Sequence, residues 1–128
     1  MPVELLLGQA EDLPFPDASF DTVLVTYSLC SVTDPARALA EIRRVLRPDA
    51  ELLFVEHGLA PDPGPRRWQE RLTPYWRRIS GNCHLDRDVF AALRAAGLRV
   101  RDGRAGYTEG ARWLSYTYEG AARVDRPA

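Results

Sequence analysis

The sequence has 128 residues, enough to enclose one hydrophobic core, so we expect a single domain over residues 1–128. Apolar residues make up 45% of it, no apolar run approaches the ~20 residues that span a bilayer, and no secretory signal is visible. We therefore expect a cytoplasmic protein without an integral membrane segment. The formal net charge of -1 gives no general attraction to nucleic acid, which we do not expect as a partner.

The first half of the chain predicts strands that alternate with a helix. The apolar run Val3–Leu7 predicts a buried strand, and Phe20–Tyr27, rich in Val and Thr, predicts a second one. An Asp-Pro pair at residues 34–35 is typical of a helix start, and apolar residues at helical spacing continue the helix to about Arg47. Glu51–Glu56 predicts a third strand.

The second half begins with a proline-rich connection and returns to helices and strands. Ala60–Pro65 contains three prolines and predicts a rigid loop, followed by a helix over Arg66–Ile79. A further helix is expected over Asp86–Ala96, and strands over Leu98–Arg101 and Trp113–Ala121. This alternation predicts an open α/β sheet, in which ligands bind outside the carboxyl ends of the strands.

Two interpretations of the Arg66–Ile79 helix stay open. Trp68, Leu72, Trp76 and Ile79 fall on one stripe, and such a stripe usually faces a core while the arginines around it are solvated. In the other interpretation, the arginines attract an anionic membrane surface or an acidic substrate, and the tryptophans cover an apolar molecule.

Three motifs follow one another in a characteristic order. They are G-Q-A-E-x-L-P-F-x-x-x-x-F-D from Gly8, V-x-D-P from Val32 and R-V-L-R-P from Arg44. Over roughly Val3–Ala121 the chain is similar to class I S-adenosylmethionine-dependent methyltransferases of the ubiquinone/menaquinone-biosynthesis type. The pattern W-Q-x-R-L-x-P-x-W-R-R-I-x-G-x-C-H-L from Trp68 resembles the thiol methyltransferases. The resemblance implies methyl transfer from S-adenosylmethionine to a small-molecule acceptor.

The resemblance also implies a partial Rossmann-like sheet. Family members order their strands 3-2-1-4-5-7-6, and this chain matches strands 3, 4, 5, 7 and 6, while strands 1 and 2 and the glycine-rich loop have no counterpart. We therefore expect the sequence to be part of a longer chain. Without its neighbours, Phe20–Tyr27 is expected to be an exposed edge that re-pairs with Val3–Leu7 or forms a homodimer. The alternative function is a non-catalytic half-domain that pairs through this edge.

The resemblance places the cofactor on two segments of the chain. Gln9 and Ala10 would hold adenine, because a side-chain carbonyl and a backbone N–H match the exocyclic amine and the neighbouring ring nitrogen. Glu11 continues that segment, and Thr26 and Tyr27 would lie beside the methionine part of the cofactor. The alternative for the first segment is a polar exit from a strand.

Two histidines are candidates for a base that assists a thiol or hydroxyl acceptor. His57 ends the third predicted strand, and His84 follows Cys83 in the chain. Glu56 is expected to point to the opposite face from His57 and to be structural. An apolar wall near adenine is expected from residues 13–15, and no metal site is predicted, since Cys83 and His84 lack a third ligand.

Overall fold

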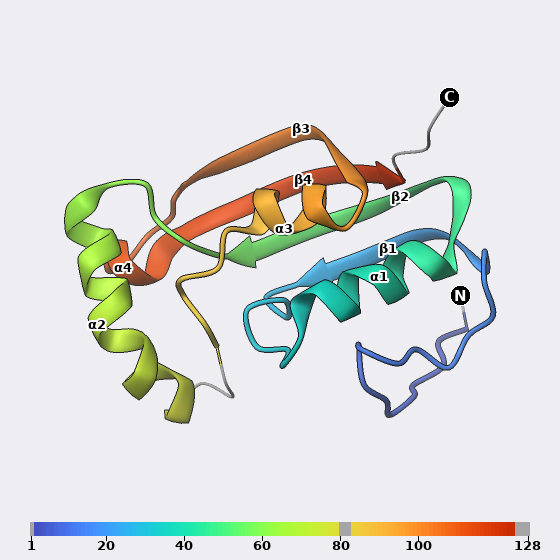
Figure 1. Cartoon of the computed structure of the whole chain (residues 1–128), viewed down its shortest axis with the longest axis horizontal. Coiled ribbons are helices and arrows are strands. Elements are labelled where there is room, and N and C mark those ends of the chain that lie inside the picture. The colour runs from blue at the N-terminus through green and yellow to red at the C-terminus, as the bar shows by residue number, and fades with distance from the viewer. Residues whose placement is uncertain (1, 80–82, 125–128) are drawn as a thin grey trace.

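The computed structural model describes residues 2–79 and 83–124, which form a four-stranded sheet flanked by helices (Figure 1). The strands are β1 (Phe20–Thr26), β2 (Leu46–His57), β3 (Leu98–Tyr107) and β4 (Tyr116–Val124). The helices are α1 (Pro35–Val45), α2 (Pro63–Ile79), α3 (Val89–Ala95) and α4 (Arg112–Ser115). The sheet order is β1-β2-β4-β3; β1 and β2 are parallel, and β4 is antiparallel to both of its neighbours.

The predicted strand Val3–Leu7 is wrong. Residues 2–8 have no regular secondary structure, and the side chains of Leu5 and Leu7 are 91% and 104% exposed. A strand requires a hydrogen-bonded neighbour, and this segment pairs neither with β1 nor with another described strand. β1 is consequently an edge strand, as expected, and the re-pairing is not observed.

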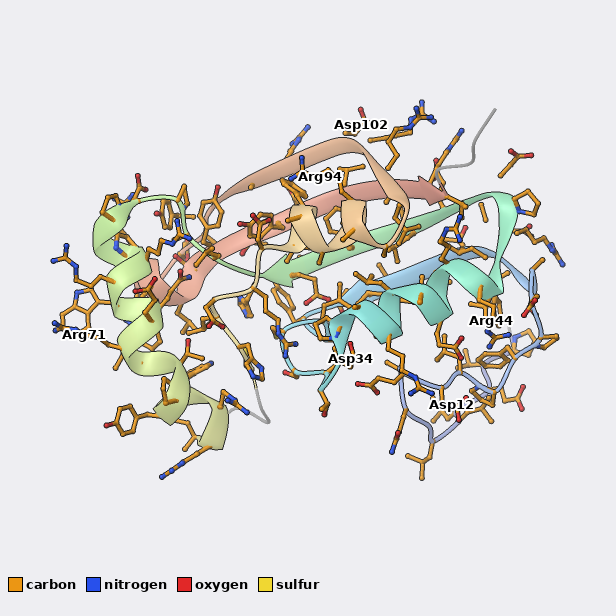
Figure 2. The ribbon with its side chains drawn as sticks, viewed as in Figure 1. Asp12, Asp34, Arg44, Arg71, Arg94 and Asp102 are labelled. Atoms are coloured by element: carbon orange, nitrogen blue, oxygen red, sulfur yellow. The ribbon has the colours of Figure 1, made fainter. Side chains whose placement is uncertain are left out.

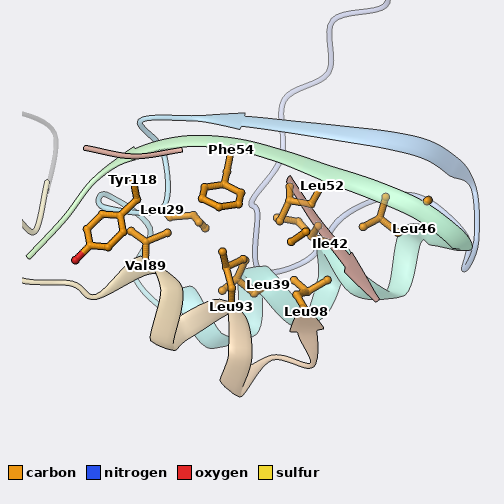
Figure 3. Close-up of a cluster of buried hydrophobic side chains, with 12 residues drawn as sticks. Leu29, Leu39, Ile42, Leu46, Leu52, Phe54, Val89, Leu93, Leu98 and Tyr118 are labelled. Atoms are coloured by element: carbon orange, nitrogen blue, oxygen red, sulfur yellow. The ribbon is translucent and has the colours of Figure 1, made fainter. Parts of the chain in front are cut away.

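The main hydrophobic core of the described residues fills the space between the sheet and the helices α1 and α3 (Figure 3). α1 begins where the Asp34 carboxylate accepts the backbone N–H of Arg37 at 3.1 Å, and Pro35 occupies its first turn, as predicted. The Asp88 carboxylate caps α3 in the same way by accepting the N–H of Ala91. The largest fully buried side chains of this core are those of Leu39, Leu52, Phe54, Leu93 and Leu98.

Several element boundaries differ from the sequence prediction. α2 begins at Pro63, because prolines are tolerated in a first helical turn, where their missing N–H has no helical partner. One helical turn, α4, occupies the start of the strand predicted from Trp113. β3 continues to Tyr107 past an irregularity between Arg101 and Arg104. No helix in the described part of the chain combines the length and the apolar character that crossing a bilayer requires.

One face of the sheet is covered by helices and the other is partly exposed to solvent. α1 and α3 cover one face (Figures 1 and 3), and Leu52, Phe54 and Glu56 of β2 point into it. On the opposite face, Leu24 of β1 is 65% exposed and its neighbour Leu53 of β2 is 38% exposed. Because side chains alternate along a strand, the end of β2 directs Glu56 and His57 to opposite faces.

This asymmetry predicts different costs for two leucine truncations. Leu39→Ala should lower the free energy of unfolding by about 2–5 kcal/mol, because Leu39 is fully buried and its removal leaves a cavity. The matched control Leu24→Ala, on the uncovered face, should change it by no more than about 0.5 kcal/mol. Urea unfolding curves measure both, and equal losses would contradict this assignment of the faces.

Candidate functional site

The carboxyl ends of β1 and β2 meet at one rim of the sheet, where Tyr27 and His57 touch. Tyr27 directly follows β1, and its N–H donates to the Val55 carbonyl at 2.8 Å. Its φ of 47° lies in the left-handed region, which a bulky residue adopts only under strain. The Tyr27 and His57 ring centroids are 4.4 Å apart. The structure thus joins a residue expected near the cofactor with one expected to act as a base.

His57 carries a polar atom that the protein does not satisfy. Its Nδ1 is buried and has no hydrogen-bond partner among the described residues. Burial also lowers the pKa of His57, because desolvation disfavours the imidazolium. The ring is therefore neutral near pH 7 and has an unused nitrogen. Buried polar atoms are normally paired, so this nitrogen points to a partner outside the chain.

Glu56 organises the loop that follows Tyr27. Its carboxylate is fully buried and accepts the backbone N–H groups of Ser28 at 3.0 Å and Leu29 at 3.2 Å. Burial raises the pKa of Glu56, and these amide donors act in the opposite direction. Glu56 is therefore a structural residue, as the alternation along β2 implied. It fixes the loop between β1 and α1, residues 27–34, which we call the rim loop.

Cys30 of the rim loop packs against Cys83 in a small buried cluster that includes Leu85. A hydrogen bond from the Cys83 thiol lowers the pKa of Cys30 to about 7 and, together with burial, raises that of Cys83. Both thiols are free. His84 lies beside them: its N–H and its Nδ1 approach the Cys30 carbonyl at 2.6 and 3.1 Å. Since a carbonyl only accepts, Nδ1 carries the proton, and Nε2 of the neutral ring holds the lone pair.

A cavity of about 170 Å³ lies between the rim loop, α1 and α3. Its lining combines apolar side chains with a thiol, an imidazole and two charged groups: Leu29, Cys30, Pro35, Leu39, His57, Arg87, Asp88, Val89 and Ala92. His84 is not in that lining. The guanidinium of Arg87 donates to the carbonyls of Leu29 and Val32 and so braces the loop. Sequence analysis missed Arg87, because nothing in its local pattern separates it from a solvated loop arginine.

The segment predicted to hold adenine forms a tight turn beside α1. The N–H of Asp12 donates to the Gln9 carbonyl at 3.0 Å. The Glu11 carboxylate accepts the N–H of Asp34 at 3.2 Å, and the Arg37 Nε donates to the Glu11 carbonyl at 3.0 Å. Backbone hydrogen bonds lower the pKa of Glu11. Glu11 therefore anchors the turn at the start of α1, where Figure 2 shows Asp34.

Gln9 and Ala10 line a surface groove of about 460 Å³ together with residues 13–15, the expected apolar wall. The guanidinium of Arg44 holds that wall by donating to the carbonyls of residues 13 and 15 at 3.0 and 2.7 Å. Thr26 and Tyr27 lie outside the groove, at the end of β1. The structure thus gathers the predicted adenine residues in one place and the predicted methionine-side residues in another.

Comparison with known proteins finds similarity to methyltransferases in the sequence and a matching fold among solved structures. A family model described as a methyltransferase domain matches residues 1–54. The thiol S-methyltransferase TMT1B of Rattus norvegicus is 40% identical over 81 residues, which are 62% of this chain and 33% of that protein. The ubiquinone/menaquinone biosynthesis C-methyltransferase UbiE of Hahella chejuensis is 46% identical over 61 residues, 48% of this chain and 24% of that protein. Over these stretches the chain is similar to S-adenosylmethionine-dependent methyltransferases.

Solved structures confirm the fold of this chain. A crystal structure described as a putative methyltransferase from Bacillus halodurans superposes with a TM-score of 0.73, covering 97% of this chain and 78% of that one at 16% identity. A geranyl diphosphate methyltransferase solved in complex with S-adenosylmethionine gives a TM-score of 0.67, covering 90% of this chain and 55% of that one at 16% identity. The α/β, Rossmann-like class predicted from the motifs is therefore confirmed. The chain spans about a third of the length of the TMT1B relatives it matches.

The lowered pKa of His57 predicts a pH-dependent stability. The neutral ring is favoured in the folded state, so its contribution is complete above the ordinary value of 6.5 and is lost as the pH falls through the lower folded pKa. Below pH 6.5 the wild type should lose stability relative to a His57→Gln variant, as measured by urea unfolding. A His84→Gln variant retains His57 and should still show this loss. A difference between wild type and His57→Gln that does not change with pH would contradict the assignment.

Proposed function

We propose that this protein, acting as one domain over residues 1–128, transfers a methyl group from S-adenosylmethionine to a small apolar acceptor. One observation carries the proposal: a strained Tyr27 and a neutral His57 with an unpaired buried nitrogen meet at the carboxyl rim of the sheet. Strain and unsatisfied polar atoms concentrate at functional sites. The similarity to a methyltransferase domain over residues 1–54 supports the reaction type, and relatives named for thiol methylation and for quinone biosynthesis support a small acceptor.

The residues of the groove fit the adenine end of this cofactor. The side-chain carbonyl of Gln9 can accept from the exocyclic amine, the N–H of Ala10 can donate to the adjacent ring nitrogen, and residues 13–15 supply an apolar surface. Glu11 fixes the turn, and Thr26 and Tyr27 are assigned to the methionine end. When bound, the cofactor supplies an electrophilic methyl group on a sulfonium.

The chain's own contribution is to position the acceptor and to manage its proton. Methyl transfer is an in-line displacement, so alignment and exclusion of water are the main requirements. We assign His57 as the base that takes the proton of a thiol or hydroxyl acceptor, since its ring is neutral and one nitrogen is unpaired. His84, whose Nε2 has the lone pair, is the second candidate base. We propose no metal ion and no nucleic acid as a partner.

We further infer a cytoplasmic location. Cys30 and Cys83 lie in one buried cluster and are both free thiols, which is the state expected in a reducing compartment.

Calorimetric titration with S-adenosylhomocysteine, followed by transfer assays with thiol and quinol acceptors, tests the proposed function. His57→Gln should lower turnover by about 100- to 10,000-fold with little change in cofactor affinity, because it removes a base and no cofactor contact. Gln9→Ala should weaken cofactor binding by about fivefold, the effect of one hydrogen bond. Arg99→Gln, an exposed change on β3, is the control. A folded sample that neither binds nor transfers would reject the function.

A second candidate function rests on the edge strand. β1 pairs only with β2 among the described strands, and Leu24 on it is 65% exposed, so a second copy can add its own β1 to the sheet. In this alternative the chain is a non-catalytic half-domain that forms a homodimer. Light scattering should then give twice the monomer mass, and Leu24→Lys should restore the monomer. A monomer at all concentrations would exclude this alternative.

A further inference from the structure

Helix α2 lies at one end of the molecule and is attached to the rest of the chain by one of its faces (Figure 1). Gln69 is fully buried; its side chain accepts the N–H of Ala60 at 2.8 Å and donates to the Gly58 carbonyl at 2.9 Å. One turn later Thr73 is also buried, and Trp76 packs edge-on against Trp113 with ring centroids 5.6 Å apart. These contacts fix the rotation of the helix about its axis.

That rotation leaves an apolar stripe on the outside. Trp68, Tyr75 and Ile79 are 54%, 70% and 79% exposed, and Leu72 lies half-buried between them. The spacing of these four residues, i, i+4, i+7 and i+11, aligns them along one side of the helix. Of the two interpretations of this helix, the one in which Trp68, Leu72, Trp76 and Ile79 all face a core is therefore wrong. Trp68 and Ile79 are exposed, and Trp76 packs inward against Trp113.

Positive charge runs beside this stripe. Arg67, Arg71 and Arg78 are all exposed and follow its outer border at helical spacing. None of them forms an ion pair within the described part of the chain. Figure 2 shows Arg71 pointing away from the body of the protein. The single acidic residue of α2, Glu70, lies on another side of the helix and is 4.0 Å from Arg66.

We propose that α2 docks this protein onto a membrane surface that contains anionic lipids. Trp68 and Tyr75 have the apolar body and polar tip that suit the boundary between headgroups and acyl chains, and Ile79 extends the apolar contact. The three arginines lie where headgroup phosphates would meet them, and a guanidinium binds phosphate through paired hydrogen bonds. The charges on the two sides are therefore complementary.

The attraction to an anionic surface is limited to α2, because the chain as a whole has no positive net charge. The formal net charge is -1, so the protein has no general affinity for an anionic surface, and only the α2 patch would orient it there. The stripe also lies on the convex surface of a helix. A flat, deformable interface can accept such a surface without a preformed groove.

Docking would bring the rim close to the lipid. The hydrogen bonds of Gln69 tie α2 to Gly58 and Ala60, and Gly58 directly follows His57. An apolar acceptor dissolved in the membrane would then reach His57 by a short path. This consequence rests on the proposed function, whereas the docking itself does not, because vesicle binding is measured without cofactor or acceptor.

Flotation of the full chain with vesicles tests the docking. We expect binding to vesicles of phosphatidylcholine mixed with phosphatidylglycerol, weaker binding to phosphatidylcholine alone, and release by salt. Changing Arg67, Arg71 and Arg78 together to Gln should lower the partition coefficient by about a hundredfold, since each cation near an anionic surface contributes about a factor of five. The matched control changes the exposed Arg99, Arg101 and Arg104 of β3 to Gln. It alters the net charge equally and should leave binding unchanged.

A second variant separates insertion from simple charge attraction. Changing Trp68 and Tyr75 together to Ser keeps every arginine and should still abolish most of the binding. The wild type should also show a blue shift of tryptophan emission on binding, which Trp68→Phe removes while the protein still floats. Circular dichroism checks that each variant is folded. Absence of wild-type binding, indifference to phosphatidylglycerol, or equal losses in the α2 and β3 triple variants would overturn the proposal.

Discussion

The buried carboxylate of Glu56 is the interaction on which the rim of this protein depends. A carboxylate without solvent exposure is costly unless hydrogen bonds satisfy it, and here the donors are the backbone amides of Ser28 and Leu29. The chain can present both amides only by turning back immediately after β1. This turn places Tyr27 in the left-handed region and brings Cys30 toward Cys83. The local strain at Tyr27 is therefore a consequence of satisfying the buried carboxyl group of Glu56 on the neighbouring strand.

At the end of β2, the structural residue Glu56 is followed directly by His57, which we propose as a base. Alternation directs Glu56 to the covered face and His57 to the other, so the same stretch of backbone stabilises the loop and places the half-buried imidazole beside Tyr27. Gly58 then lets the chain pass close to the ring of Tyr118, because a Cβ at this position would lie 2.3 Å from that ring. The hydroxyl of Tyr118 donates to the Leu59 carbonyl at 2.6 Å and completes the turn. Glu56 and Gly58 thus hold the loop and the turn that flank His57.

The sequence predicted correctly those elements that depend on residues close to one another in the chain. The Asp-Pro start of α1 and the alternation of β2 are readable because a cap and a pleat depend on neighbours in the sequence. The strand predicted over Val3–Leu7 is wrong for the opposite reason. Its apolar run is typical of a strand, but a strand forms only with a hydrogen-bonded partner elsewhere in the chain. In α2 the period was correct and the rotation was wrong, since Trp76 and Tyr75 both continue a helical stripe from Trp68. The buried hydrogen bonds from Gln69 to Gly58 and Ala60, which lie outside the helix, decide which of the two rings faces inward.

The side chains that we propose for the reaction are those that lack a hydrogen-bond partner, or remain exposed, in the described part of the chain. The buried carboxylate, the Arg87 guanidinium and the Tyr118 hydroxyl are all hydrogen-bonded within the protein and so serve to hold the rim. The Nδ1 atom of His57 has no partner among the described residues, and the Tyr27 side chain beside it is 47% exposed. A protein that keeps a buried nitrogen unpaired gives up stability at that point. A ligand that pairs with this nitrogen and covers Tyr27 would recover that free energy on binding, so the same defect that weakens the rim favours occupation of the site.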